Sequence, residues 1–227
     1  MNNFKDRFSA KNITGVAVLL ALVIVLQAVG GTISIGAVQL NFTLIPIVLG
    51  AILFGEWVGA FLGFSCGVVI LIQVITGAVP FYALIWTNDP VVTTLVCLLK
   101  TTVAGYLAGL FYRLIAKKSE IAGVFVASAT VPVINTALFI VGCLCMKSVH
   151  GLAVADGVNI LVFILVGLVT FNFFIELGIN LVFAPALDRV IRVVEKRVSK
   201  NYNEEVETEE VETEEVSKEK DDITEEK

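Results

Sequence analysis

The sequence predicts an all-α integral membrane protein, a bundle of six transmembrane helices, from its composition and from the spacing of its charges. Hydrophobic residues make up 57% of the 227 residues and charged residues 16%, whereas soluble domains are about 45–50% apolar. The apolar residues run continuously and do not alternate with polar ones, which favours helices over a β-barrel. Several uncharged stretches reach or exceed the roughly 20 residues that a helix needs to cross about 30 Å of hydrocarbon. They are 12–55, 57–88, 121–146 and 157–175.

Each expected helix ends where glycine, proline or polar residues interrupt an apolar run. The first ends at Gly30-Gly31, and a short outer segment, 35–41, follows it. The second is the shortest and contains Pro46, and Gly55-Glu56 makes a tight turn into the third. The stretch 77–90 contains two prolines and is expected to be a structured loop. The six expected helices are 13–30, 42–54, 57–76, 91–115, 121–146 and 157–184.

The positions of lysine and arginine predict the orientation, because cytoplasmic loops are enriched in them. With six helices, one side of the membrane receives all the flanking basic residues except Lys147. We therefore expect a multi-pass protein of the cell (plasma) membrane with both termini in the cytoplasm. A secretory signal peptide is the alternative for the first apolar run, but that run is long, lacks a small-residue cleavage site and precedes further spans. The basic residues in question are Lys5, Arg7, Lys11, Arg113, Lys117, Lys118, Arg189, Arg192, Lys196 and Arg197.

The composition changes abruptly near the carboxyl end. Residues 199–227 hold 13 acidic residues against 4 lysines, and the repeat Glu-Glu-Val-Glu-Thr occurs twice over 204–213. Such a segment has little apolar surface to bury and repels itself, so it cannot offset the entropy lost on ordering. We expect two regions, a membrane-embedded domain over 1–198 and a disordered, acidic cytoplasmic tail over 199–227.

One motif resembles a catalytic site but is better explained by packing. The run 63–67, Gly-Phe-Ser-Cys-Gly, matches the G-x-S-x-G nucleophile pattern, which requires a strand, a sharp turn, a helix and a histidine base. Here it lies within an apolar helix, and the chain's one histidine, His150, falls in an expected outer loop. Small residues at intervals of four allow two helices to approach closely. The glycines with this spacing are Gly59, Gly63 and Gly67 on one helix and Gly105 and Gly109 on another.

Other motifs of catalysis and metal binding are not found in the sequence. It has no P-loop, no H-E-x-x-H and no G-x-G-x-x-G that opens a helix. The four cysteines lie in apolar runs without C-x-x-C spacing or a zinc-type histidine. We therefore expect no catalytic residue, no metal, no cofactor and no nucleic-acid partner, and we do not expect an enzyme. The cysteines are Cys66, Cys97, Cys143 and Cys145.

Two ionisable residues inside the expected helices are functional candidates, because a charge within lipid costs roughly 2.5–3.5 kcal/mol on insertion scales. Lys100 is placed near mid-membrane, and Glu176 lies nearer the cytoplasmic end of its helix. A direct pair is not expected, because their depths differ by roughly two helical turns. A structural contact and ligand binding are both open for Lys100.

Polar residues at compatible heights complete a candidate site for a small molecule, since a few polar groups orient a ligand within apolar surroundings. Each amide by itself is as compatible with hydrogen bonding between helices. Asn172, Glu176 and Asn180 share one helix face, and a packing seam is favoured for Asn180. The candidate substrate-binding residues are Lys100, Asn135, Gln73, Asn172, Tyr82, Trp86, Asn88 and Asp89.

Residues 12–185 resemble the substrate-binding S component of energy-coupling-factor (ECF) vitamin transporters. The resemblance rests on the six-span layout, on the run 42–55 followed by Trp-Val-Gly-Ala over 57–60, and on the pair Ala17 and Ala21. This pair matches the family's Ala-x-x-x-Ala motif for docking onto its partner.

The resemblance implies a subunit that binds a vitamin or related micronutrient outside the cell and hydrolyses nothing itself. It implies docking through Ala17 and Ala21 onto a transmembrane coupling subunit that carries two ABC ATPases, with ATP-driven reorientation in the bilayer. The amino-acid sequence between the second and fourth helices is most similar to that of pantothenate-type members. Lys100 would suit a carboxylate through a charge-assisted hydrogen bond. Folate, riboflavin and a thiamin precursor remain open.

A second hypothesis is a self-sufficient, ion-coupled secondary transporter of a small organic solute, in which Glu176 carries the coupled ion. Such proteins are often built from inverted repeats and discontinuous helices. The two halves show no clear repeat, although Pro46 and Pro132 could interrupt helices. Uptake driven by an ion gradient without ATPases would distinguish this hypothesis.

Overall fold

The computed structural model describes most of the chain, in two compact units, Met1–Leu187 and Asp188–Lys227. The predicted acidic tail, 199–227, lies outside the described residues. In the second unit the described part is helical as far as residue 194, and Arg192 Nε lies 2.9 Å from Asp188 Oδ2. The described residues are 10–30, 34–35, 38–39, 41–78, 80–194 and 196.

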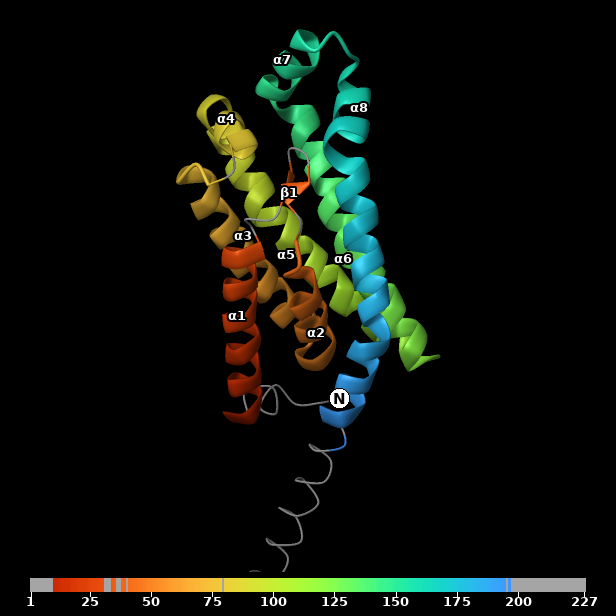
Figure 1. Cartoon of the computed structure of the whole chain (residues 1–227). Coiled ribbons are helices and arrows are strands. Elements are labelled where there is room, and N and C mark those ends of the chain that lie inside the picture. Colours follow the sequence, from red (N-terminus) through yellow and green to blue (C-terminus); the bar gives the residue numbers. More distant parts are fainter. Residues whose placement is uncertain are drawn as a thin grey trace, which may run out of the picture. The chain divides into compact units, whose positions relative to one another are not determined.

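The first unit is a bundle of helices with one very short strand pair, β1 (Ser34–Ile35) and β2 (Val38–Gln39), which are antiparallel (Figure 1). The last helix runs over Ile160–Val194, and its residues up to Leu187 belong to this unit. It begins as α8 (Ile160–Val162) and passes through a π-helix, Phe163–Val169. The remaining helices are α1 (Ala10–Gly30), α2 (Leu44–Phe54), α3 (Glu56–Ile75), α4 (Pro80–Asn88), α5 (Pro90–Ile115), α6 (Glu120–Cys145) and α7 (Lys147–Ala155).

Five helices are long and apolar enough to cross a membrane, so the predicted count of six is not confirmed. They lie within α1, α3, α5, α6 and the last helix. The exception is α2, which has 11 residues and extends roughly 16 Å at about 1.5 Å per residue, about half of a hydrocarbon layer of about 30 Å. The prediction of an all-helical, multi-pass membrane bundle is correct, apart from the two-residue strands.

The structure also corrects the expected structured loop over 77–90. Gly77, with φ of 73°, follows the end of α3, and most of the stretch then forms α4. The outer loop expected after α6 contains a second short helix, α7. These two helices lie together at one end of the bundle (Figure 1), the end at which α5 begins.

The glycines predicted to pack helices closely do so between α3 and α5. A Cβ atom added at Gly59 would lie 2.5 Å from the carbonyl oxygen of Gly105, and one at Gly67 would lie 2.5 Å from that of Cys97. Between them, a Cβ at Gly63 would overlap the carbonyl of Thr101. Backbone therefore meets backbone along this interface, which confirms the packing interpretation. Ser65, within the same motif, donates its hydroxyl to the carbonyl of Phe61 in its own helix.

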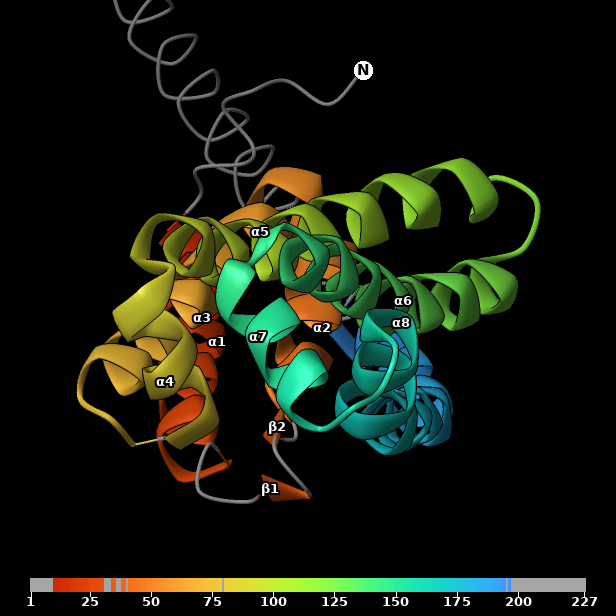
Figure 2. The ribbon, with the colours of Figure 1, turned by 90° about the horizontal axis from the view of Figure 1, so that it is seen from above.

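The short helix α2 lies inside the bundle, where it contacts α1, α3, α5 and α6 (Figure 2). Pro46 is its third residue, a position where the missing N–H leaves no helical hydrogen bond broken. A buried polar cluster lies at its start: Thr43 Oγ1 donates to Gln27 Oε1 at 3.3 Å and lies 3.3 Å from Cys66 Sγ. This cluster connects α2 to α1 and α3, and it fixes the segment from which Asn41 projects.

Candidate ligand-binding site

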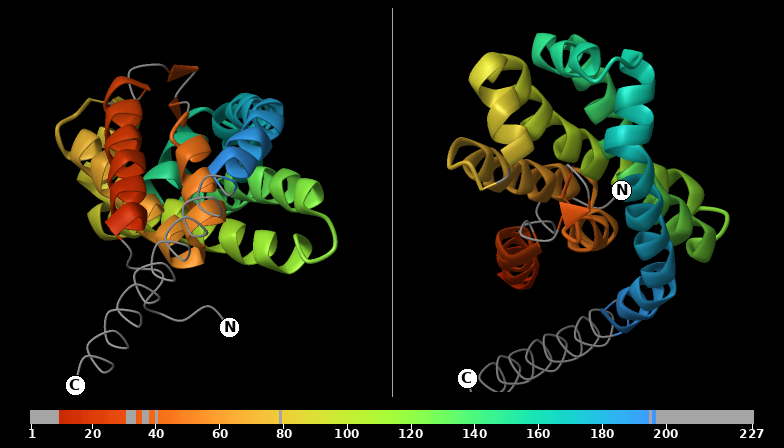
Figure 3. Two further views of the ribbon diagram at one scale, coloured as in Figure 1. Left: turned by 90° about the horizontal axis from the view of Figure 1, so that it is seen from below. Right: turned by 45° about the horizontal axis from the view of Figure 1, so that its top comes forward.

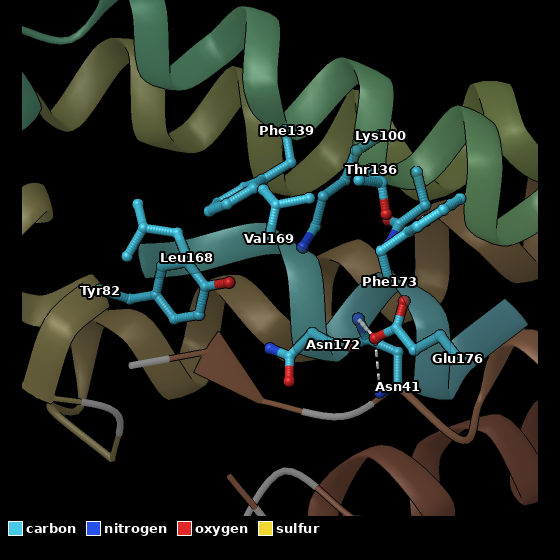
Figure 4. Close-up of a pocket in the computed structure, with 11 residues that line it drawn as sticks. Asn41, Tyr82, Lys100, Thr136, Phe139, Leu168, Val169, Asn172, Phe173 and Glu176 are labelled. Atoms are coloured by element: carbon cyan, nitrogen blue, oxygen red, sulfur yellow. Dashed lines mark hydrogen bonds between the residues drawn. The ribbon is translucent and has the colours of Figure 1, made fainter. Parts of the chain in front are cut away.

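A pocket lies among α4, α5, α6, the last helix and Asn41, three residues before α2 (Figure 4). It encloses about 300 Å³ of empty space when its open mouth is included. The room that a water-sized body reaches inside is only about that of one molecule, so a larger ligand has to move side chains apart. The lining residues are Asn41, Tyr82, Lys100, Asn135, Thr136, Phe139, Leu168, Val169, Asn172, Phe173 and Glu176.

Lys100, on α5, is the cation of the pocket, and its side chain is 4% exposed. Its Nζ lies 5.8 Å from the centre of the Tyr82 ring and 5.5 Å from that of Phe139. Both distances are within the range of cation–π attraction. Across the described part of the chain, the ammonium has no hydrogen-bond acceptor and no carboxylate within ion-pair distance. A buried ammonium with three free donors is suited to an anionic ligand.

Two buried amides face the pocket without hydrogen bonds. Asn172, on the last helix, has neither Nδ2 nor Oδ1 paired, and Asn135, on α6, has Oδ1 unpaired. Because both amide atoms of Asn172 lack partners, exchanging its oxygen and nitrogen changes nothing. Buried polar groups almost always have partners. Unpaired amides that line a pocket are therefore positions at which a ligand or water completes the bonding.

Glu176 lies one turn beyond Asn172 on the last helix and is bound to the segment that precedes α2. Its Oε1 accepts hydrogen bonds from the backbone N–H of Asn41 at 3.0 Å and from Asn41 Nδ2 at 2.8 Å. The dashed lines in Figure 4 mark these two bonds. Glu176 and Lys100 share the pocket without forming an ion pair with each other, as their predicted depths indicated.

Four of the eight predicted substrate-binding residues line this pocket, namely Lys100, Asn135, Asn172 and Tyr82. Gln73 does not, because its side-chain amide is hydrogen-bonded to Gln27 on α1. Gln27 Nε2 donates to Gln73 Oε1 at 3.1 Å, and Gln73 Nε2 donates to the Gln27 carbonyl at 3.0 Å. Gln73 therefore joins two helices, the alternative role that the sequence left open for each amide.

The other three predicted residues, Trp86, Asn88 and Asp89, lie at the end of α4 outside the pocket lining. Asn88 donates to the carbonyl of Leu84 in its own helix. Asp89 Oδ2 accepts from the backbone N–H and the hydroxyl of Ser148 on α7, at 2.8 and 2.5 Å. These hydrogen bonds from Ser148 hold the pKa of Asp89 below its usual range. Asp89 thus connects the start of α5 to α7.

Several lining residues are outside the predicted substrate-binding set, although one of them, Glu176, was a functional candidate from the sequence. Phe139 follows Asn135 by four residues and Leu168 precedes Asn172 by four, so helical spacing from the two amides would have found both. Asn41 has no such signal, because its place depends on contact with a helix more than a hundred residues later. The lining residues outside the predicted set are Asn41, Thr136, Phe139, Leu168, Val169, Phe173 and Glu176.

The predicted docking residues, Ala17 and Ala21, are both exposed on α1. This helix lies at the edge of the bundle (Figure 3), and its buried side chains form one narrow stripe that includes Leu19, Val23 and Gln27. None of the described residues of α1 lines the pocket. The exposed alanines and the pocket are therefore on separate parts of the molecule.

Comparison with known proteins gave one family. The family model described as "ECF transporter, substrate-specific component" matches residues 11–187, well over half of the chain. Among curated proteins, the search found no match.

Proposed function

The chain belongs to the family of substrate-specific components of ECF transporters, and from this membership we propose that the pocket around Lys100 binds the molecule that the transporter carries. Members of the family are substrate-binding subunits of transporters and not enzymes. Membership also implies a small-molecule substrate and partners from an ECF module. With its apolar helices, the chain is a multi-pass membrane protein.

The observation that carries the site proposal is the set of unpaired polar groups inside a buried pocket. Both polar atoms of Asn172 and the amide oxygen of Asn135 are buried without partners, and the Lys100 ammonium in the same pocket has no ion-pair partner among the described residues. The aromatic rings of Tyr82 and Phe139 border the ammonium. Polar groups converging within apolar walls are typical of ligand sites. We assign Lys100 to the anionic group of the ligand and the amides to its remaining polar atoms.

Pantothenate is the ligand we propose for this pocket. Its carboxylate suits Lys100, its amide and hydroxyl groups suit the asparagines, and its dimethyl group suits the aromatic and aliphatic walls. The sequence similarity to pantothenate-type members supports the same choice. Uptake brings the ligand from outside the cell to the cytoplasm, with both termini of the chain on the cytoplasmic side of the plasma membrane.

For the energy source, we propose docking through Ala17 and Ala21 onto a transmembrane coupling subunit with two ABC ATPases. The exposure of both alanines on α1 supports this role, because small side chains allow another helix to approach closely within lipid. ATP hydrolysis then takes place in the partners. Uptake by this chain in vesicles without ATPases would contradict the proposal and favour an ion-coupled transporter.

Mass spectrometry of the small molecule that co-purifies with the detergent-solubilised protein tests the ligand, and pantothenate is expected. Binding to a Lys100→Met variant then tests the site. Losing a charge-assisted hydrogen bond costs about 1.5–3 kcal/mol, so pantothenate should bind roughly ten- to a hundredfold more weakly.

Lys117→Met is the matched control, because Lys117 is exposed beyond the end of α5. The control should bind as the wild type does. Equal affinities of wild type and Lys100→Met would make Lys100 structural and would remove the site assignment.

A further inference from the structure

We propose that Glu176 forms a second recognition point in the pocket, so that the site selects organic acids that also carry hydroxyl groups over acids that lack them. This inference rests on the proposed function, in which Lys100 takes the anionic group. It adds a specificity-determining residue and defines the chemical class of the ligand.

The first step is the state of the two Glu176 oxygens. Oε1 is occupied by two hydrogen bonds from Asn41, one from its backbone and one from its side chain. These bonds fix the carboxyl group in place within the described structure. The second oxygen has no hydrogen-bond partner among the described residues, and Glu176 lines the pocket. One oxygen thus positions the group, and the other is available to a ligand.

The second step is the separation of the two charged side chains. Lys100 and Glu176 are both 4% exposed and both line one pocket, yet no oxygen of Glu176 lies within ion-pair distance of Lys100 Nζ. A ligand bound between them meets an ammonium at one place and a carboxyl oxygen at another. If the carboxylate of the ligand binds Lys100, a different group of the ligand has to bind the free oxygen of Glu176.

The third step is the inventory of atoms that a ligand has to satisfy. Beside Lys100, the pocket offers Oδ1 of Asn135 and both polar atoms of Asn172, which are buried and unpaired. It also offers the second oxygen of Glu176, since Asn41 binds only the first. Oxygen acceptors are therefore prominent, and a simple acid would leave them unpaired. A hydroxyl group can serve any of these atoms, because it both donates and accepts. Sites built around hydrogen bonds strongly reject analogues that lack the matching group.

Titration calorimetry with three probes tests the inference on the full-length wild-type protein. The probes are pantothenate, with a carboxylate and two hydroxyls; N-pivaloyl-β-alanine, with the carboxylate and amide but no hydroxyl; and panthenol, with hydroxyls but no carboxylate. We expect pantothenate to bind at least about tenfold more tightly than either analogue, since each leaves buried groups unpaired.

A Glu176→Gln variant then assigns the discrimination to this residue. It keeps the size of the side chain but changes its hydrogen-bonding groups, so the ratio of affinities for pantothenate and N-pivaloyl-β-alanine should fall by at least about threefold. The affinity for panthenol, which carries the hydroxyl groups, should fall by a similar factor. Glu120→Gln is the matched control, because Glu120 is exposed at the start of α6, and its ratio should equal that of the wild type.

Equal binding of pantothenate and N-pivaloyl-β-alanine by the wild type would overturn the inference without any variant. If this equal binding still depends on Lys100, the proposed function stands and only the role of Glu176 falls. An unchanged ratio in a folded Glu176→Gln protein would likewise remove that role. If none of the three probes binds, both the hydroxy-acid class and the pantothenate proposal are contradicted.

Discussion

At the scale of single residues, Lys100 gives the pocket its chemistry. Placing a charge in the middle of a membrane costs roughly 2.5–3.5 kcal/mol on insertion scales, and contact with aromatic faces returns about 0.5–2 kcal/mol. The rings of Tyr82 and Phe139 provide such faces. No carboxylate of the described residues lies within ion-pair distance of the ammonium to offset the remainder. An anionic ligand that supplies the missing partner therefore also stabilises the fold.

The contact between Asp89 and Ser148 gives a prediction about acid sensitivity. Because the hydrogen bonds from Ser148 lower the pKa of Asp89, they stabilise the fold above the usual carboxyl range. That contribution is lost as the pH falls through the lowered pKa. Ser148→Ala should reduce stability by no more than about 1 kcal/mol, because the site is open to solvent.

Thermal unfolding of both proteins at several pH values checks this prediction. The Tm difference between wild type and Ser148→Ala should narrow as the pH falls from about 6 to about 3. A difference that stays constant over this range would show that the carboxylate form of Asp89 is not what Ser148 stabilises.

The sequence predicts part of the site at this scale and not the rest. Lys100, Asn135 and Asn172 stand out because polar groups are rare and costly within apolar helices. Phe173 does not stand out, since an aromatic residue that lines a pocket looks the same in sequence as one that faces lipid. Gln73 shows the opposite problem, because Gln27 satisfies it from another helix.

At the scale of elements, the π-helix Phe163–Val169 distinguishes the last helix from the others. Two of its residues, Leu168 and Val169, line the pocket. The hydroxyl of Thr170 donates to the carbonyl of Leu165, five residues earlier. π-Helical turns are rare and frequently occur at functional sites. Here the wider turn comes just before Asn172 and Glu176, which also line the pocket.

The interface of α3 and α5 gives a prediction about stability. Gly63→Ala places a methyl group on the backbone carbonyl of Thr101, and backbone cannot move aside as a side chain can. Overpacking of this kind costs about 1–3 kcal/mol, so the melting temperature in detergent should fall. Gly178→Ala is the control, since nothing lies within 4 Å of a Cβ atom at that position.

The control protein should be as stable as the wild type or slightly more stable, because alanine favours a helix over glycine. If Gly63→Ala and Gly178→Ala melt at the same temperature, the close approach of α3 and α5 is not the reason for the glycine spacing.

The long helices could be predicted because length and hydropathy suffice to find them, whereas α4 required information that the sequence pattern hides. Its two flanking prolines suggested a loop. In the structure Pro80 begins α4 and Pro90 begins α5. At the first position of a helix the missing N–H of proline costs nothing. A proline that interrupts an apolar run can therefore begin a helix.

At the scale of the whole molecule, the proposed binding site and the proposed docking residues lie on different elements. The pocket is lined from α4, α5, α6, the last helix and Asn41, whereas the exposed alanines belong to α1. The two regions are joined through the buried contacts of Gln27 with Thr43 and Gln73. Because Ala17 and Ala21 are exposed and no described residue of α1 lines the pocket, changes to the exposed face of α1 should leave the pocket intact.

Leucine in place of Ala17 or Ala21 should reduce ATP-dependent uptake and leave ligand binding unchanged. A large side chain prevents the close approach of another helix, and a misfit of about 1–3 kcal/mol weakens docking by roughly five- to a hundredfold. Uptake by the complex reconstituted in proteoliposomes, together with calorimetry of the isolated subunit, separates the two effects.

Ala137→Leu is the matched control, because Ala137 is exposed on α6. It should support normal uptake. If the Ala17 and Ala21 variants lose ligand binding as well, these alanines support the fold and not the docking of a partner.

The narrowness of the pocket has a kinetic consequence. A space with room for about one water molecule has to widen before a vitamin-sized solute fits, so encounter alone does not complete association. The association rate constant should then fall well below the diffusional ceiling of about 10⁸–10⁹ M⁻¹s⁻¹. The observed binding rate should approach a plateau at high solute concentration, where opening of the protein becomes the slow step. The same barrier delays departure, so that a solute once captured is held long enough for the slower events of transport.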